Sequence, residues 1–409
     1  MALASTSSVG LTYLEESTYG TTPETGTSVP LRITGEDLSF DFTTETSKEI
    51  NNTRQSPDSI LVNASAAGGF NFELSYSTFD DFLEALLAST FDTDNGTAGV
   101  LSIAVTADCT VSGTGGTITA ASGSWADLPA APFWFALAGS GAVVSGVSNA
   151  GAYLVTTKSS TMLTLSAATT LAKDMAGTVT ISNCRLTNGV ADQRSFSIEK
   201  SFKDVDQYFM HTGRVPSKLD LSFTTGAVVT GTIGFLGSTA VRADATQFVS
   251  GVTAGTATSY GMMNTVTGVG ALSIKNSTGT ELLTDTFVQS MKVSIDGALR
   301  EQKAIGTLGA VGIGVGTFKI GGTAEIYLKT GAIYDAALAD QLLSVTFPVT
   351  DSLGNGYGFT FNNVKFKVPK VVAGGQDADV MMSVEFTAVA PDTSTDKMIC
   401  IDRIGEAIS

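Results

Sequence analysis

Few side chains in this sequence are of the types that do chemistry, and none has a catalytic spacing. The only histidine, His211, lies among aromatic residues, and a lone histidine of this kind is more often structural than catalytic. There is no nucleophile elbow, zinc-protease motif or phosphate-binding loop with its lysine. Gly309–Gly316 is glycine-rich, but it precedes an expected strand where a dinucleotide site needs a helix. The sequence therefore predicts a protein that is not an enzyme and that needs no metal and no cofactor.

Charge and cysteine content exclude further classes. The net charge is −16, from 39 acidic and 23 basic residues, so binding to a phosphate backbone through lysine and arginine is not the expected main function. Three cysteines, Cys109, Cys184 and Cys400, make neither a disulfide framework nor a zinc motif. We expect buried thiols, with a contact between Cys109 and Cys184 left open.

The start of the sequence has no secretory features. It lacks a basic segment followed by an apolar one. The most apolar stretch, residues 131–147, is interrupted by Gly and Ser and is too short to span a bilayer. These features predict a soluble protein that is made in the cytoplasm and has no membrane partner.

The acidic residues recur at alternating positions in short apolar segments. Residues 70–76 set four large apolar side chains against Asn71, Glu73 and Ser75, which is typical of a strand that buries one face and wets the other. Six further segments place an acidic side chain on the expected wet face. The residues concerned are Asp41, Glu73, Glu199, Asp220, Asp296, Glu325 and Glu385.

A strand followed by a short amphipathic helix occurs twice, which indicates an internal duplication. The first copy is the strand at 70–76 with a helix at 79–90, and the second is the strand at 323–328 with a helix at 333–343. The spacing of Thr78 and Asp81 predicts a capping box at the first helix. The stripe expected to pack in the second helix is Tyr334, Leu338 and Leu342.

Composition divides the chain into three units, and glycine and threonine content makes all of them mainly β. Residues 1–96 and 189–240 form the first copy, and residues 255–409 form the second. Residues 97–188 contain both tryptophans and have no counterpart in the second copy, so we interpret them as a small inserted β-domain. A polar stretch at 238–258 is expected to link the copies.

One long polar segment is also unequal between the copies. Thr43–Ala67 is expected to be a loop, whereas the equivalent segment at 298–316 is shorter and rich in glycine. Loops of this length without secondary structure are uncommon unless they bind something. The charged residues expected to make such contacts are Lys48, Glu49, Arg54 and Asp58.

Several segments in this order resemble the major tail tube proteins of long, flexible-tailed bacteriophages. They are the duplicated strand–helix unit and residues 194–208, 228–236, 355–365 and 374–386. The resemblance covers most of the chain outside residues 97–188, and none of the segments is a catalytic signature.

The resemblance implies a fold and an assembly. The fold is a duplicated tube domain, each copy a β-sandwich with one flanking helix, and the inserted domain decorates the outside of the tube. Six tube domains make a ring, so a duplicated chain implies three chains per ring with pseudo-sixfold symmetry, stacked along an axis. The segment Thr43–Ala67, with Lys48, Glu49, Arg54 and Asp58, is then expected to contact a neighbouring ring. The implied location is the virion tail, assembled in the host cytoplasm, with tape measure, terminator and distal tail proteins as partners.

In such a tube the seven acidic residues are candidates for lining the channel. A negative lumen would repel phosphate and let DNA pass to the host without specific binding, since fields act over a Debye length of about 8 Å. Each residue has an alternative place on an outer, solvated face. The residues alone also leave open a secreted or surface adhesin or carbohydrate-binding protein, for which Trp125 and Trp134 would be the evidence.

Overall fold

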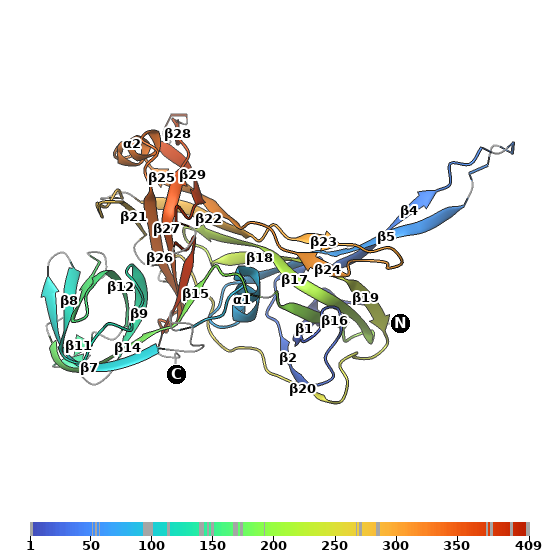
Figure 1. The fold of residues 1–409 in the computed structure, drawn as a ribbon, viewed down its shortest axis with the longest axis horizontal. Coiled ribbons are helices and arrows are strands. Elements are labelled where there is room, and N and C mark those ends of the chain that lie inside the picture. The colour runs from blue at the N-terminus through green and yellow to red at the C-terminus, as the bar shows by residue number, and fades with distance from the viewer. Residues whose placement is uncertain are drawn as a thin grey trace.

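The computed structural model describes residues 3–50, 52–53, 55–56, 58–92, 101–112, 115–138, 143–144, 147–148, 151–166, 171, 175–191, 193–266, 268–269, 272–283, 287–373, 375–376, 379–392 and 396–405. The protein is mainly β, as the sequence predicts, with two α-helices in the part that the structure describes (Figure 1). One large sheet runs through both copies, a closed barrel lies beside the second copy, and a long hairpin projects from the first.

The central part of this sheet joins the two copies through their own strands. The long strand β17 of the first copy pairs with β22 of the second, from Lys218 opposite Asp296 to Thr224 opposite Ser290. In order across the sheet, the antiparallel neighbours are β6 (Gly69–Glu73), β18 (Thr230–Leu236), β17 (Gln207–Thr224), β22 (Val288–Asp296), β25 (Lys319–Tyr327) and β29 (Met381–Ala388). The short strands β3 (Gly35–Glu36) and β28 (Lys370–Val372) lie at its two edges.

Each copy adds a second ladder of four strands to this sheet. In the first copy the order is β1 (Val9–Glu16), β16 (Ser195–Phe202), β17 and β19 (Thr239–Ala243). In the second it is β21 (Ser273–Asn276), β26 (Leu343–Thr350), β27 (Gly356–Phe366) and β30 (Cys400–Ile404). The far ends of β17 and β27 pair with β18 and β29 respectively, so the copies share one topology.

One apolar core runs through both copies and is rich in phenylalanine. Phe70, Phe82 and Phe235 pack together in the first copy, with ring centroids 5.6 Å apart. Phe347 stacks on Phe359 at 5.3 Å in the second. Large rings on alternating positions bury much area at low conformational cost and fill the space between the ladders. The core thus fixes the sheets rigidly around the junction of the copies.

The first helix, α1 (Asp80–Leu87), lies at this junction and is shorter than the helix predicted at 79–90. Its buried residues include Phe82, Leu83, Leu86 and Leu87. The predicted capping box is wrong. Phe79 occupies the cap position, and the Thr78 hydroxyl instead bonds the Ser75 hydroxyl at 2.7 Å, which takes it away from the helix backbone.

The second helix, α2 (Ala332–Leu338), is shorter than predicted and buries a different face. Its buried residues are Ile333, Ala336 and Ala337, whereas Leu338 is 60% exposed. The helix ends before Leu342, so the predicted stripe of Tyr334, Leu338 and Leu342 does not form.

The inserted segment folds into a closed barrel of six strands. Its order is β12 (Gly151–Lys158), β13 (Met162–Leu165), β8 (Gly115–Ser122), β7 (Leu101–Ser112), β14 (Met175–Asn183) and β9 (Phe133–Ala138). A small hairpin, β10 (Val143–Val144) with β11 (Val147–Ser148), lies between β9 and β12. The next strand, β15 (Arg185–Thr187), pairs with β30 and not with the barrel. The expected boundary at residue 188 therefore takes in a strand of the second copy's ladder.

The predicted polar linker is part of the first copy. Besides β19, it contains β20 (Val252–Ala254), which pairs in parallel with β2 (Gly26–Pro30). The expected end of the first unit at residue 240 falls inside β19, so strand pairing continues to residue 254.

The expected long loop is a β-hairpin. Strands β4 (Ser39–Thr46) and β5 (Ser59–Ala67) pair along their length and extend away from the body (Figure 1). The equivalent segment of the second copy is a short hairpin of β23 (Arg300–Gln302) and β24 (Gly312–Gly314), which lies along the base of the long one. The Ser65 hydroxyl donates to Glu301 at 2.8 Å and joins the two hairpins.

Candidate channel face and the junction of the two repeats

The central sheet brings five of the seven acidic candidates to one face. A row of directly paired positions runs across it from Glu73 to Glu385; between them lie Thr230, Ser222, Lys292 and Thr323. Asp220 lies two residues from Ser222 on β17, and Glu325 lies two residues from Thr323 on β25. Asp296 lies four residues from Lys292 on β22. Residues an even number apart in a strand share a face, so all three lie on the face of this row. The predicted wet face is therefore one continuous surface that crosses both copies.

The opposite face of the same strands is buried. Phe72, Leu221, Val293, Ala324 and Val384 all lie in the core and alternate with the polar row. A one-residue change of register would exchange the two faces, so the apolar core holds the polar side chains outward.

Lysines, which the sequence reasoning left out, lie among the acids of this face. Lys218 forms an ion pair with Asp220 at 2.8 Å, and Lys367 from the end of β27 reaches Glu385 at 2.5 Å. Asp296 lies between Lys218 and Lys319 in the register. The face thus carries charges of both signs and is partly exposed to solvent. These lysines occupy the same alternating positions as the acidic residues, so the period-2 pattern of the strands could have revealed them.

Two of the acidic candidates lie elsewhere. Glu199 is buried, because residues 246–247 fold over it: the Thr246 hydroxyl donates to its carboxylate at 2.8 Å and the Gln247 N–H at 2.6 Å. The expectation that it lies on a wet face is wrong. Asp41 is exposed on β4 of the projecting hairpin, where it accepts a hydrogen bond from the Ser39 hydroxyl at 2.9 Å.

The expected contact residues lie near the tip of the hairpin. Lys48, Glu49 and Asp58 are exposed, and Lys48 lies 3.6 Å from Glu45. Arg54 is outside the described residues. The hairpin also exposes apolar side chains that the sequence analysis did not single out, namely Phe42, Ile60, Leu61 and Val62.

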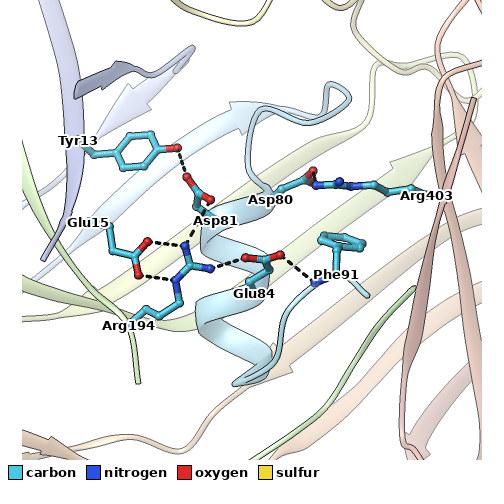
Figure 2. Close-up of polar contacts among 8 residues, drawn as sticks. All are labelled: Tyr13, Glu15, Asp80, Asp81, Glu84, Phe91, Arg194 and Arg403. Atoms are coloured by element: carbon cyan, nitrogen blue, oxygen red, sulfur yellow. Dashed lines mark hydrogen bonds and ion pairs between the residues drawn. The ribbon is translucent and has the colours of Figure 1, made fainter. Parts of the chain in front are cut away.

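Acidic residues of α1 hold the helix to its own copy. Arg194, just before β16, binds the Glu15 carboxylate through two contacts of 2.7 and 2.5 Å and also contacts Glu84 and Asp81 of the helix (Figure 2). The Tyr13 hydroxyl donates to Asp81 at 2.8 Å. These carboxylates surround one guanidinium and tie the helix to β1 and to the start of β16 through charge-assisted hydrogen bonds.

Asp80 holds the same helix to the second copy. Its buried carboxylate accepts a hydrogen bond from the Tyr357 hydroxyl on β27. It accepts another from Arg403 on β30, which lies beside it in Figure 2. Burial raises the pKa of Asp80, and Arg403 opposes that shift. The Arg403 guanidinium also lies 4.2 Å from the centre of the Phe91 ring. Nothing in the sequence pattern marks this contact, because its partners are 277 and 323 residues away.

A second buried ion pair anchors the barrel. The carboxylate of Asp402 on β30 accepts hydrogen bonds from Arg185 at 2.7 and 2.9 Å and from the Asn183 side chain at 3.1 Å. It also accepts one from the backbone N–H of Trp134 at 2.9 Å. Trp134 packs on Leu154 and Ile404, and Trp125 is buried in the barrel core. Because neither indole ring is exposed, the tryptophans give no support to a carbohydrate-binding surface.

His211 has a structural contact at the base of the hairpin. Its Nδ1 atom accepts a hydrogen bond from Arg214 at 2.8 Å, and burial lowers its pKa to about 3. Arg214 also donates to the carbonyls of Ala67 at 2.7 Å and Ser39 at 2.8 Å, which are opposite each other in the hairpin. The pair fixes the root of the hairpin to β17.

Comparison with known proteins decides between the remaining interpretations. The family model for the phage tail tube protein matches residues 6–388, which is nearly the whole chain. The chain belongs to the phage tail tube protein family. A search of curated proteins finds no match.

Membership makes this tail tube protein a structural component of the phage tail that assembles into a tube with other tail proteins. Among the described residues there is no group of side chains that could hold a metal ion. No helix in the described part of the chain is long and apolar enough to cross a bilayer. Cys109, Cys184 and Cys400 are buried thiols, as expected.

Proposed function

We propose that three chains form a closed ring with pseudo-sixfold symmetry and that rings stack into the tail tube. The observation that carries this proposal is the pairing of β17 with β22, which joins two tube domains edge to edge within one chain. The edges at β3 and β28 pair on one side only in the described residues, and a second copy would cover them. Each domain then meets its neighbour in the same way around the ring.

The polar face of the central sheet lines the channel in this proposal. The lining residues are Glu73, Asp220, Asp296, Glu325 and Glu385, repeated around the ring. Carboxylates hold two lysines of the same face, Lys218 at Asp220 and Lys367 at Glu385, which reduces the positive charge presented to phosphate. DNA then passes to the host through a hydrated bore without specific binding.

The projecting hairpin makes the contact between successive rings in this proposal. It is fixed at its root by Arg214, and its paired strands expose Phe42 and Ile60 between the root and the charged tip. Exposed apolar side chains on a projecting element mark an interaction site.

Tape measure, terminator and distal tail proteins would cap and fill the tube, and assembly would take place in the host cytoplasm.

A threefold ring is tested by symmetry analysis of purified assemblies. Negative-stain class averages of end-on rings should show three outer densities, one for each barrel. Six such densities per ring would contradict the three-chain ring, and the absence of rings and tubes in purified protein and in particles would contradict the tube itself.

A further inference from the structure

The central sheet repeats a unit of four strands, one unit from each copy. The first unit consists of β3 with the start of β4, then β6, β18 and the C-terminal half of β17. The second consists of β22, β25, β29 and the end of β27 with β28. The sheet therefore begins with a strand of the β22 type and ends with a strand of the β17 type.

The first edge of the sheet is equivalent to β22 position by position. Residues 35–41 lie opposite residues 71–65 of β6 and β5, and residues 290–296 of β22 lie opposite residues 325–319 of β25. These partners are themselves aligned, because residue 71 lies opposite 232 of β18 and residue 325 lies opposite 383 of β29. Asp37 of the edge therefore takes the place of Lys292, and Ser39 takes the place of Ser294.

The last edge of the sheet is equivalent to β17 in the same way. Residues 216 and 220 of β17 lie opposite residues 235 and 232 of β18, on either side of a bulge. Residues 366 and 370 lie opposite residues 386 and 383 of β29, also on either side of one extra residue. Lys370 of β28 therefore takes the place of Asp220, and Val371 takes the place of Leu221.

The charges at these two edges are the reverse of those where the copies meet. Within the chain, Asp220 lies opposite Ser294, and Lys292 lies diagonally from it on the same face. At the edges a lysine, Lys370, replaces this aspartate, and an aspartate, Asp37, replaces this lysine. Opposite charges therefore face each other between the two edges, as they do within the chain, whereas β28 beside β22 would bring two lysines together.

An apolar side chain is left uncovered at the last edge in the part of the chain that the structure describes. Val371 is 44% exposed, whereas its equivalent Leu221 is 2% exposed because Val293 lies opposite it. Leu38 takes the place of Val293 at the first edge. Its N–H donates to the Glu36 side chain at 3.1 Å, so this edge donor is held by its own chain until a strand replaces that side chain.

We propose that β28 of one chain pairs with residues 37–41 of a second copy of this chain, in the register that β17 and β22 have within one chain. Lys370 then lies opposite Ser39, between Asp37 and Asp41, and Val371 lies opposite Leu38. This contact, the seam, rests on the proposed ring and names the strands that close it. The two edges cannot meet within one chain, because six strands separate them and β28 and β4 lie far apart (Figure 1).

The seam shares a strand with the projecting hairpin. From Ser39 to Asp41, β4 pairs with β5 on one side and with β28 of the neighbouring chain on the other. The root of the hairpin is therefore held from both sides once the ring closes. The strand that closes the ring is then the strand that carries the contact between rings.

One difference makes the seam weaker than the junction within the chain. Pro369 takes the place of Leu219 and has no N–H to donate across the seam. Side-chain charge therefore carries a larger share of the contact between chains.

Paired cysteines test the register. Positions 370 and 39 are equivalent to 220 and 294, a non-hydrogen-bonded pair, in which Cα atoms lie about 4.5 Å apart and a disulfide can form. Lys370→Cys with Ser39→Cys should give covalent dimers and trimers on mild oxidation, and no larger species, because three seams close the ring.

The matched control keeps Lys370→Cys and moves the second cysteine to an exposed position of the same strand. In Lys370→Cys with Thr43→Cys, that cysteine lies four residues along β4, roughly 13 Å away. Because the natural cysteines are buried, this variant should stay monomeric on denaturing gels. Tubes of the first variant without a cross-link, or equal cross-linking in the control, would overturn the seam and leave the proposed tube intact. Covalent species larger than trimers would support the seam and contradict the three-chain ring.

Charge exchange tests the seam without oxidation. Lys370→Asp places a third carboxylate beside Asp37 and Asp41 and should raise the critical concentration for assembly by about fivefold or more, with a smaller effect at high salt. Adding Asp41→Lys should restore assembly. Normal assembly of Lys370→Asp, or no recovery in the double variant, would overturn the seam, whereas failure of the unmodified protein to form rings would overturn the proposed function as well.

Discussion

Replacing Arg185 with methionine tests whether a buried ion pair fixes the barrel to the second copy. The Asp402 carboxylate is fully buried and accepts two of its four hydrogen bonds from this guanidinium. Removing one partner of a buried pair leaves the other charge without compensation, which costs about 3–5 kcal/mol. We therefore expect the free energy of unfolding to fall by that amount in Arg185→Met.

The partner change separates the ion pair from simple loss of packing. In the double variant Arg185→Met with Asp402→Asn, the uncompensated charge is gone, while the amide still accepts from the Trp134 N–H. We expect this variant to recover at least half of the loss. Lys218→Met removes a lysine from an ion pair that is about half exposed, and it should change the free energy by less than about 1 kcal/mol.

Denaturation by urea, followed by tryptophan fluorescence, measures all of these variants. Both tryptophans are in the barrel, and Trp134 contacts the site, so the fluorescence transition reports this part of the chain. A loss below about 1 kcal/mol for Arg185→Met, or a double variant as unstable as the sum of the two single changes, would refute the reasoning.

Three further outcomes are expected. The pKa of His211 is about 3 in the folded protein and 6.5 in the unfolded chain. Its contribution to stability is therefore complete above pH 6.5 and is lost on acidification, by up to about 1.4 kcal/mol per pH unit. Urea titrations should show a flatter pH profile of stability for His211→Asn, and an unchanged profile would count against this assignment. Deleting residues 97–182 behind a Gly/Ser linker should leave tubes, whereas deleting 97–188 should reduce soluble yield because Asp402 then loses Arg185, and equal yields would refute the boundary drawn here. Replacing Glu73, Glu325 and Glu385 on the polar face of the central sheet with lysine changes the chain's charge from −16 to −10. DNA ejection should then be slow and salt-sensitive, in tails of normal appearance. Normal ejection would exclude the electrostatic account if a tube reconstruction places these three residues in the bore.

Local patterns predicted the central sheet well. The alternation at Phe70–Glu73 fixed both its buried and its wet face, because a side-chain period of two leaves only two orientations in a strand. The same rule failed at Glu199, since a loop more than forty residues away covers the second face of β16. Burial on both faces is a property of the tertiary fold, and the strand's own sequence carries no sign of it.

The junction of the copies could not be predicted for a related reason. Asp80 and Arg403 are ordinary charged residues in their local segments, and only the folded chain brings them together. The hairpin was expected to be a loop because its polar, threonine-rich sequence lacks an apolar core. Its strands are held by backbone pairing and, at the root, by Arg214, whose place in a strand gives no indication of this role.

A reconstruction of the assembled tube by electron cryomicroscopy tests the central claim most directly. The account predicts three chains per ring, a continuous inner sheet, and Glu73 and Glu325 facing the bore with the barrels outside. A ring of six chains, or a tube in which this polar face points outward, would contradict it.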